Sequence, residues 1–365
     1  MKKKLIKAVK NLVVACVLIC TLVIGYIMVK RFINSCEYRI KTENGIQEST
    51  FIEVNGIKQY IQIRGEDVNN PVIICIHGGP ANPISYIAPY FQKEIEDVAT
   101  FIQYDQRGCG RTYYENYANS EANVEMLLAD LDGIVDYARE RFNKEKVIIM
   151  GHSWGTALGT LYVQEYPEKV AGYIALSQVT NVRENKLSAA KKASETEEIK
   201  GTSDEEKLCT LMEKWQQVEQ FADLSMQELS EMTALAGKYV GCEGEVKGFD
   251  MFKIGLYSND MGVQDIKWFL ETASAENYIS YNRDIMNYFL FDYDIEQLSC
   301  VYEMPVYYVA GEGDYIISQD DAKVYFEKIE APKKEFILLQ NTGHDMFLDD
   351  PELFGEIIRN IIKEI

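Results

Sequence analysis

Residues 147–159, VIIMGHSWGTALG, constrain the fold of this chain more than any other segment. An apolar run typical of a buried strand is followed by the pattern G-x-S-x-G, and then by small residues typical of a closely packed helix. Gly151 and Gly155 flank a turn that larger side chains would block, and the turn lifts the Ser153 hydroxyl above the sheet. The first N–H groups of the next helix face that hydroxyl and can stabilise negative charge there. The segment predicts a nucleophilic serine and a hydrolase that forms a covalent acyl-enzyme.

Apolar runs alternate with helical periods on both sides of this segment. Asn55-Gly56 lies between two alternating runs and indicates a hairpin over residues 49–64. Further strands are expected at 72–76, 98–104, 147–150, 171–176, 304–310 and 336–339. Helices are expected at 122–142, 157–165, 321–328 and 351–365. Strands that alternate with helices predict an α/β fold with a mostly parallel sheet.

The alternation stops between residues 181 and 298, where the sequence is charged and mainly helical. We therefore predict one α/β core in two parts, 48–180 and 299–365, with a helical cap at 181–298. Sites in open α/β sheets form at the carboxyl ends of the strands, so an insertion there covers the site.

The first 31 residues are expected to lie outside the core. Residues 11–29 form an uncharged apolar run that spans roughly 28 Å as a helix, close to the thickness of a bilayer core. Five lysines precede the run and Lys30-Arg31 follow it, which favours an N-terminus on the inside. We interpret 1–31 as an uncleaved signal anchor, 32–47 as a linker, and the catalytic domain as extracytoplasmic. A cleaved signal peptide is the alternative, although the run is long for one and no A-x-A-like site follows.

Charge and cysteine content restrict the partners of the chain. The net charge is −20, and beyond residue 31 the chain carries 30 basic and 57 acidic side chains. Such a surface repels nucleic acid and attracts cationic ligands. The eight cysteines do not predict a disulfide framework, and there is no C-x-x-C or paired Cys/His spacing typical of zinc. We therefore expect no metal or other cofactor; the sequence does not indicate the oligomeric state.

The chain has three histidines that could serve as the base for Ser153. His152 is adjacent to the nucleophile, so its side chain is expected to point away from it. His77 ends a predicted strand and precedes two glycines, where a backbone role is more natural. His344 lies in a loop just after the last predicted strand. When a G-x-S-x-G serine comes first in the chain, the acid and then the histidine follow it, so the base is expected near this position. Elimination therefore leaves His344.

The acid that orients the base should precede it in the sequence. Asp314 follows the 304–310 strand and can hold the imidazole in the correct tautomer. Glu312 and Asp345 are the rivals; Glu312 is too near the strand end, and Asp345 should point away from its neighbour.

Two backbone N–H groups are needed where the oxyanion forms. Trp154, the residue after the nucleophile, supplies one of them. We expect the other from Gly79, in the loop after the 72–76 strand, because glycine allows the backbone a close approach.

Three motifs together resemble the prolyl aminopeptidase (proline iminopeptidase) family of α/β-hydrolases. They are His77-Gly78-Gly79-Pro80, Asp105-Gln106-Arg107-Gly108-Cys109-Gly110-Arg111-Thr112 and Gly151-His152-Ser153-Trp154-Gly155-Thr156. The resemblance covers residues ~50 to 365 in order. It implies the α/β-hydrolase fold with a helical cap, a triad carried here by Ser153, Asp314 and His344, and release of an N-terminal residue, often proline, from peptides.

The resemblance also implies acidic cap residues that hold the free amine of the substrate. Trp215-Gln216-Gln217-Val218-Glu219 is similar to the family segment W-x-x-W-E, with valine in place of the second tryptophan, and makes Glu219 the candidate amine anchor. The family motif H-G-G-P-G ends here in Ala81. The Asp105–Thr112 loop is expected to shape the floor of the site.

Three functions follow from these expectations. The first is a membrane-anchored serine aminopeptidase that acts on short peptides. The second is an esterase or amide hydrolase for a small non-peptide substrate, which would use the same triad and need no amine anchor. The third is a cell-surface binding protein without catalytic activity, since a fold does not fix a function.

Overall fold

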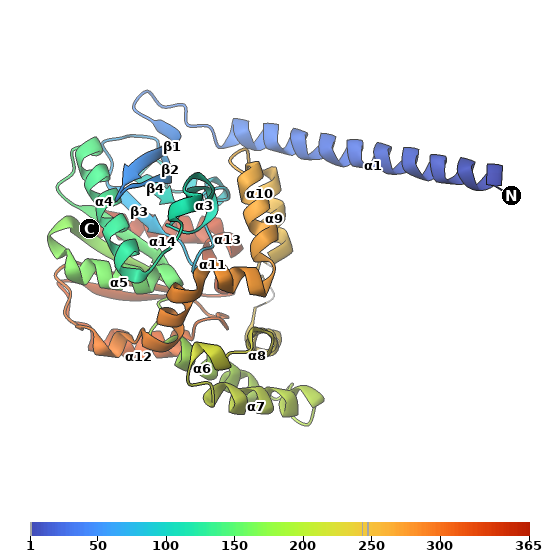
Figure 1. Cartoon of the computed structure of the whole chain (residues 1–365). Coiled ribbons are helices and arrows are strands. Elements are labelled where there is room, and N and C mark those ends of the chain that lie inside the picture. The colour runs from blue at the N-terminus through green and yellow to red at the C-terminus, as the bar shows by residue number, and fades with distance from the viewer. Residues whose placement is uncertain (1, 243, 247) are drawn as a thin grey trace.

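The computed structural model describes residues 2–242, 244–246 and 248–365. Its centre is an eight-stranded sheet in the order β1-β2-β4-β3-β5-β6-β7-β8 (Figure 1). The strands are β1 (Ile46–Val54), β2 (Ile57–Gly65), β3 (Val72–Ile76), β4 (Thr100–Tyr104), β5 (Val147–His152), β6 (Val170–Leu176), β7 (Val306–Gly311) and β8 (Lys334–Leu339). The hairpin β1–β2 is antiparallel and pairs antiparallel with β4, whereas the six strands from β4 to β8 are parallel. The predicted α/β class and mostly parallel sheet are confirmed.

Every predicted strand is present, with ends that differ from the predicted ones by at most three residues. The difference that matters for the site is in β5, which continues to His152 because Gly151 and His152 still pair with Ala175 and Leu176 of β6. The strand therefore runs up to the residue before Ser153, and the turn at the serine starts from a hydrogen-bonded backbone.

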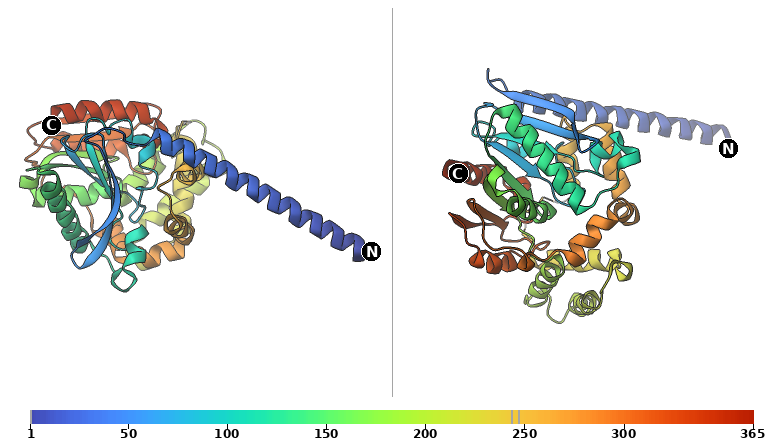
Figure 2. Two further views of the ribbon diagram at one scale, coloured as in Figure 1. Left: turned by 90° about the horizontal axis from the view of Figure 1, so that it is seen from above. Right: turned by 60° about the vertical axis from the view of Figure 1, so that its left-hand side comes forward.

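Helices cover both faces of the sheet. One face packs against α4 (Val124–Phe142), α5 (Trp154–Glu165) and α12 (Gln319–Lys328), and the other against α2 (Pro89–Gln92), α13 (Met346–Asp349) and α14 (Pro351–Glu364). The left view of Figure 2 shows α14 on the side of the sheet opposite to α4 and α5. Capping residues fix two of the starts: Asn123 accepts a hydrogen bond from the N–H of Met126 at α4, and Asp350 accepts one from Leu353 at α14.

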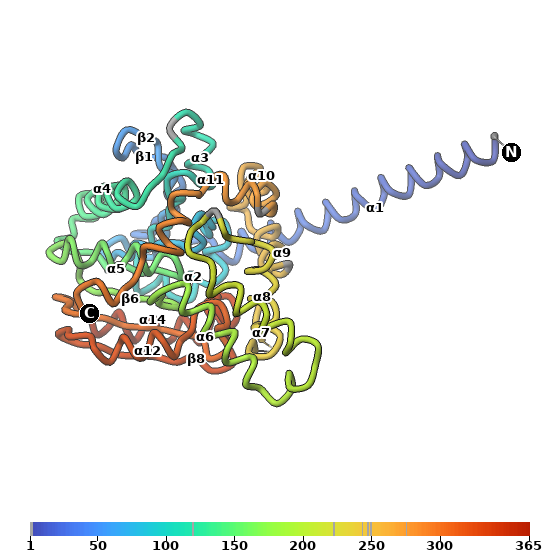
Figure 3. The backbone as a smooth tube through the Cα atoms, turned by 60° about the horizontal axis from the view of Figure 1, so that its bottom comes forward, coloured from blue at the N-terminus to red at the C-terminus, as the bar shows by residue number. Residues whose placement is uncertain are grey.

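The cap lies between β6 and β7 and is helical. Its helices are α6 (Val182–Ser194), α7 (Ser203–Gln216), α8 (Met226–Val240), α9 (Gly248–Tyr257), α10 (Val263–Thr272) and α11 (Ala275–Asn287). Figure 3 shows α6, α7 and α8 together at one end of the domain, with α9 and α10 beside them. Single turns complete the chain at η1 (Tyr117–Asn119), η2 (Pro167–Lys169), η3 (Phe221–Asp223), the π-helical η4 (Tyr288–Asp292) and η5 (Ile295–Gln297). The short helix α3 (Gly110–Glu115) was not expected, because six residues are too few to show a helical period.

A long helix, α1 (Lys2–Glu37), projects from the domain (Figure 1). By length and composition it can cross a membrane, a test that a signal sequence also passes. The helix ends at Glu37 and β1 begins at Ile46, so the stretch without regular structure covers 38–45 and is shorter than the linker expected at 32–47. The last turns of α1 stay helical because they pack on the cap, where Asn34 donates to the carbonyl of Tyr257 at 3.0 Å.

Candidate active site

Ser153 lies at the turn between β5 and α5 with φ 53° and ψ −121°, a backbone conformation that residues other than glycine rarely adopt. The flanking glycines leave no room for a side chain. A Cβ on Gly151 would lie 2.4 Å from the oxygen of Gly155, and a Cβ on Gly155 would lie 2.1 Å from the oxygen of Ile76. The turn therefore has the geometry that the G-x-S-x-G pattern predicts, with the serine raised at the end of the strand.

His344 and Asp314 form a hydrogen-bonded pair beside the serine turn. The Nδ1 atom of His344 lies 2.9 Å from Oδ2 of Asp314, and the second carboxylate oxygen accepts the N–H groups of Ile316 and Ile317, each at 2.9 Å. Asp314 follows β7 and His344 follows β8, so both come from the carboxyl end of the parallel sheet. Ser153 and His344 line the same cavity. The three residues expected to form a triad are thus brought together.

The pKa values of the pair shift in the direction that stabilises a charged histidine. Burial on its own would lower the pKa of His344, but the charge and hydrogen bond of Asp314 raise it above its ordinary value of 6.5. Burial would raise the pKa of Asp314, but His344 and the backbone donors hold it below its ordinary value. Asp314 is therefore an anion in the folded protein at neutral pH, and the imidazole next to it gains a proton more readily than a free one.

Neither rival acid takes the position of Asp314. Glu312 lies on the surface and accepts the N–H of Asn341 at 3.4 Å. Asp345 lines the cavity and lies 3.6 Å from Nε2 of His152, and burial raises its pKa to about 6.

Of the two residues expected to form the oxyanion hole, Trp154 directly follows Ser153 and Gly79 lines the same cavity as Ser153. Trp154 is the first residue of α5, so its N–H is one of the four at the helix start that have no partner within the helix. Gly79 has φ 117° and lines the cavity. A Cβ on the preceding Gly78 would lie 3.1 Å from Cβ of Ser153, so this glycine loop packs directly against the serine turn.

The loop after β4 contacts both the serine turn and the glycine loop. Gln106 accepts a hydrogen bond from the indole Nε1 of Trp154 at 3.1 Å and donates its amide to the carbonyl of His77 at 3.1 Å. The Asp105–Thr112 loop was expected to shape the floor of the site, but none of its residues lines the cavity; it lies behind the two loops that do and supports them. Sequence reasoning gave Gln106 no separate importance, because only the fold shows that its side chain joins the two loops.

The remaining histidines have structural partners. Nε2 of His77 accepts the N–H of Gln106 at 3.2 Å, and burial lowers the pKa of His77 to about 4. His152 does reach the cavity, but its Nε2 lies 3.0 Å from the backbone oxygen of His344, and burial lowers its pKa to about 3. The ring of His152 turns toward the loop that carries His344 and contacts the backbone of that loop.

The cavity has a volume of about 400 Å³. Core loops supply its floor and the cap helices α9 and α10 supply much of its wall. Aromatic and aliphatic side chains predominate there, among them Tyr86, Met251, Trp268 and Phe269. The carboxylates that line it are those of Glu245, Asp265 and Asp345. The lining of the cavity is thus largely apolar and includes three carboxylates.

Asp265 and Glu245 are held in different surroundings. Asp265 receives a fork of hydrogen bonds from Arg111, from Nε at 3.0 Å and from Nη2 at 2.6 Å, so its charge is paired with a cation. Glu245 is half-buried and packs over the backbone of Gly343: a Cβ on this glycine would lie 2.9 Å from Cγ of Glu245. A carboxylate next to the His344 loop is something that the sequence pattern did not reveal, because it lies in a cap loop with no motif.

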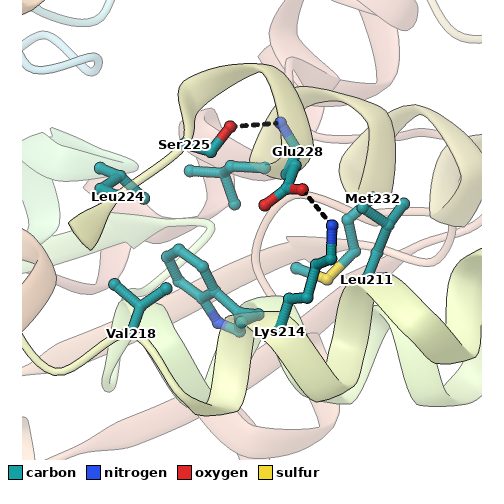
Figure 4. A pocket seen from close by; sticks show the side chains of 9 residues that line it. Leu211, Lys214, Val218, Leu224, Ser225, Glu228 and Met232 are labelled. Atoms are coloured by element: carbon teal, nitrogen blue, oxygen red, sulfur yellow. Dashed lines mark hydrogen bonds and ion pairs between the residues drawn. The ribbon is translucent and has the colours of Figure 1, made fainter.

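Glu219, the expected amine anchor, is not brought to the site. It is exposed in the loop after α7 and does not line the cavity. Figure 4 shows its neighbour Val218 among the side chains that line the crevice between α7 and α8, on the same side as Leu224. The W-x-x-W-E likeness therefore marks a packing segment of the cap, and the expectation for Glu219 is corrected.

The fold and this geometry agree with the match of the chain to a known family. Residues 71–351 match the family described as alpha/beta hydrolase fold. The chain belongs to that family.

The similar proteins include named peptidases. A probable aminopeptidase of Bacillus subtilis, YbaC, is 26% identical over 310 residues, which cover 84% of this chain and 93% of that protein. A proline iminopeptidase of Neisseria gonorrhoeae is 35% identical over 130 residues, which cover 34% of this chain and 38% of that protein. The crystal structure of a proline iminopeptidase from Mycobacterium smegmatis superposes with a TM-score of 0.60 at 16% identity, covering 87% of this chain and 98% of that one. The resemblance drawn from the motifs is confirmed.

Proposed function

We propose that this protein is a serine aminopeptidase that releases the first residue of short peptides through an acyl-enzyme. The observation that carries the proposal is the 2.9 Å hydrogen bond between His344 and Asp314 in the cavity that Ser153 lines. The Ser153 hydroxyl attacks the carbonyl carbon while His344 takes its proton, and His344 then gives that proton to the leaving amine. Water next hydrolyses the ester in the same way and frees the serine.

The other residues of the site stabilise this reaction. Asp314 keeps Nδ1 of His344 protonated, which leaves Nε2 as the base, and it offsets the imidazolium charge. The N–H groups of Trp154 and Gly79 donate to the oxyanion of the tetrahedral intermediate.

The carboxylates that line the cavity favour a substrate with a free amino terminus. An α-ammonium group carries a positive charge, and a carboxylate that is partly shielded from water binds it more strongly than a carboxylate on the surface. We propose Glu245 as the anchor for this amine, because it lines the cavity beside the His344 loop. Curated relatives named aminopeptidase and proline iminopeptidase support the same choice of substrate.

The helix α1 is proposed to be a retained membrane anchor, with its lysine-rich start inside and the catalytic domain outside. Retention is supported by the contacts of its last turns: Arg31 donates to the carbonyls of Leu256 at 2.8 Å and Met261 at 3.1 Å. Cleavage would remove these contacts between α1 and the cap.

The test uses the full chain in detergent beside Ser153→Ala, with alanyl- and prolyl-arylamides, an N-acetylated prolyl-arylamide and a p-nitrophenyl ester. We expect turnover of the free-amine arylamides that needs Ser153 and is lost on acetylation. Ester turnover without arylamide cleavage would leave an esterase. No labelling of Ser153 by a fluorophosphonate would leave a binding protein without catalytic activity.

Two glutamate variants separate the anchor from the rest of the cap. Glu245→Gln is expected to raise KM for free-amine substrates about tenfold, the equivalent of about 1.4 kcal/mol, and to leave ester hydrolysis unchanged. Glu219→Gln is the matched control and should change neither activity, because that carboxylate is exposed outside the cavity. Equal KM values for Glu245→Gln and the unmodified protein would rule out Glu245 as the anchor.

A further inference from the structure

The end of α1 is fixed to the cap by specific contacts. Arg31 and Asn34 donate to carbonyls at the end of α9 and just before α10, at distances from 2.8 to 3.1 Å. Carbonyls at the end of a helix have no partner within it, so a cation placed there also interacts favourably with the helix dipole. The rings of Tyr26 and Tyr257 meet edge to face, with centroids 5.9 Å apart. These contacts set the direction of α1 relative to the domain.

The same contacts lie where the apolar run of α1 ends. Residues 11–29 carry no charge, and Lys30 and Arg31 follow directly. Tyrosines and basic residues at the end of a membrane span lie at the level of the lipid headgroups. Arg31 is therefore both the residue at the membrane boundary and the residue that binds the α9–α10 junction.

The outer side of α10 carries two large apolar side chains that are exposed, beside the polar Gln264 and Lys267. Val263 is 82% exposed and Leu270 is 64% exposed, and their spacing of seven residues corresponds to two helical turns, which places both on one face. Lys267 lies between them on that face, and Phe269 stacks on Phe252 of α9 with centroids 4.7 Å apart. Large apolar side chains interleaved with lysine are typical of a helix that lies in the interface of a bilayer.

Figures 1 and 2 show α9 and α10 on the side of the domain from which α1 projects. We propose that the outer face of α10, which lies beside α9 and is centred on Val263 and Leu270, rests on the lipid bilayer that α1 crosses. This inference rests on the proposed anchoring by α1. The domain is strongly acidic and is repelled by anionic headgroups, so the contact is an apolar one with the boundary between headgroups and acyl chains.

The inner side of the same two helices forms a wall of the catalytic cavity. Met251 of α9 and Trp268 of α10 line that cavity. One layer of helices therefore separates the cavity from the lipid, and substrates concentrated at the membrane surface are near the site.

The test uses tryptophan fluorescence in the full chain. The three native tryptophans, Trp154, Trp215 and Trp268, are all buried, and their fluorescence and its quenching are measured in the unmodified protein and subtracted. Val263→Trp and Leu270→Trp are reconstituted into phosphatidylcholine vesicles with and without bromine near the top of the acyl chains. Val324→Trp on α12 is the matched control, since Val324 is 60% exposed in the core part of the domain.

We expect brominated lipid to reduce the added fluorescence of Val263→Trp and Leu270→Trp by about half, and to leave Val324→Trp unchanged. If the two cap variants are quenched no more than the control while the protein withstands a carbonate wash, the membrane contact is overturned and the anchor stands. Release of the protein by the wash overturns both. Fluorophosphonate labelling of each variant checks that the fold and Ser153 are intact.

Discussion

Nε2 of His152 lies 3.0 Å from the backbone oxygen of His344, so the residue before the nucleophile holds the loop that carries the base. A carbonyl oxygen only accepts, and Nε2 of His152 therefore carries the proton in this contact. The two rings lie side by side with centroids 4.8 Å apart. The distance between nucleophile and base thus depends on a neighbour that takes no proton itself.

Replacing His152 by phenylalanine keeps a ring of similar size and removes the donor. We expect kcat to fall about tenfold, because a small displacement of the His344 loop spoils the alignment of base and nucleophile. KM should stay within about twofold, and the melting temperature should fall by a few degrees, in keeping with the loss of about 1 kcal/mol. Steady-state kinetics and thermal unfolding measure these effects. An unchanged kcat would mean that the contact is only structural.

The pH dependence of ester hydrolysis reports the base. His344 must be neutral to accept the serine proton, so kcat/KM rises with pH through the pKa of His344. Because Asp314 raises this pKa, the midpoint should lie above 6.5. Asp314→Asn removes the raising charge while burial still lowers the pKa, so the midpoint should move to lower pH and kcat should drop about 10⁴-fold. An ester substrate has no amine whose titration would add to the pH profile. A midpoint that does not move in Asp314→Asn would mean that Asp314 does not set the pKa of the base.

Gln106 joins the two loops that supply the proposed oxyanion donors. Gln106→Leu removes both of its side-chain hydrogen bonds and leaves the indole of Trp154 and the carbonyl of His77 without this partner. We expect kcat to fall about 10²-fold, comparable to the loss of one oxyanion donor, with a smaller change in KM. Gln106→Glu keeps an acceptor for the indole and should recover part of the activity. Equal activity of both variants would contradict this positioning role.

A buried ion pair ties the first part of the core together. Arg64 and Glu96 are 1% and 4% exposed at their side chains, and Nε of Arg64 lies 2.6 Å from Oε1 of Glu96. Glu96→Leu leaves a buried guanidinium without its partner and is expected to lower the free energy of unfolding by about 3–5 kcal/mol. Glu296→Leu breaks a half-exposed pair with Lys328 and should cost about 1 kcal/mol or less. Chemical denaturation of both variants compares the two costs directly.

The core of the fold could be predicted because its strands are continuous apolar runs between turns. The strand at 72–76 was placed at its observed ends, and the helix at 122–142 began two residues too early. The two parts of the core were expected on either side of a helical insertion, because the strand pattern stops at 176 and resumes near 304. The linker was predicted too long, because the last turns of α1 pack on the cap and stay helical up to Glu37.

The candidate site could be predicted where chemistry and chain order restrict the choice. Ser153, Asp314 and His344 each follow a strand, and the carboxyl ends of parallel strands meet at one edge. Glu245 and Gln106 could not be found in this way, because their positions depend on how the cap and core loops pack. Glu219 was misplaced for the same reason: a short likeness in the cap carries no information on which side of a helix pair faces the cavity.

The neighbouring strands β6 and β7 are hydrogen-bonded to each other, although the whole cap separates them along the chain. Because the two strands are parallel, a segment inserted between them leaves the carboxyl end of β6 and closes a crossover to the amino end of β7, whatever its length. A different cap has only to connect these two strand ends, because the sheet, the serine turn and the histidine loop are built from the sequence on either side of the cap. Substrate choice and bond-breaking chemistry can thus diverge separately, and a chimaera that carries a foreign cap should retain a serine that reacts with fluorophosphonates.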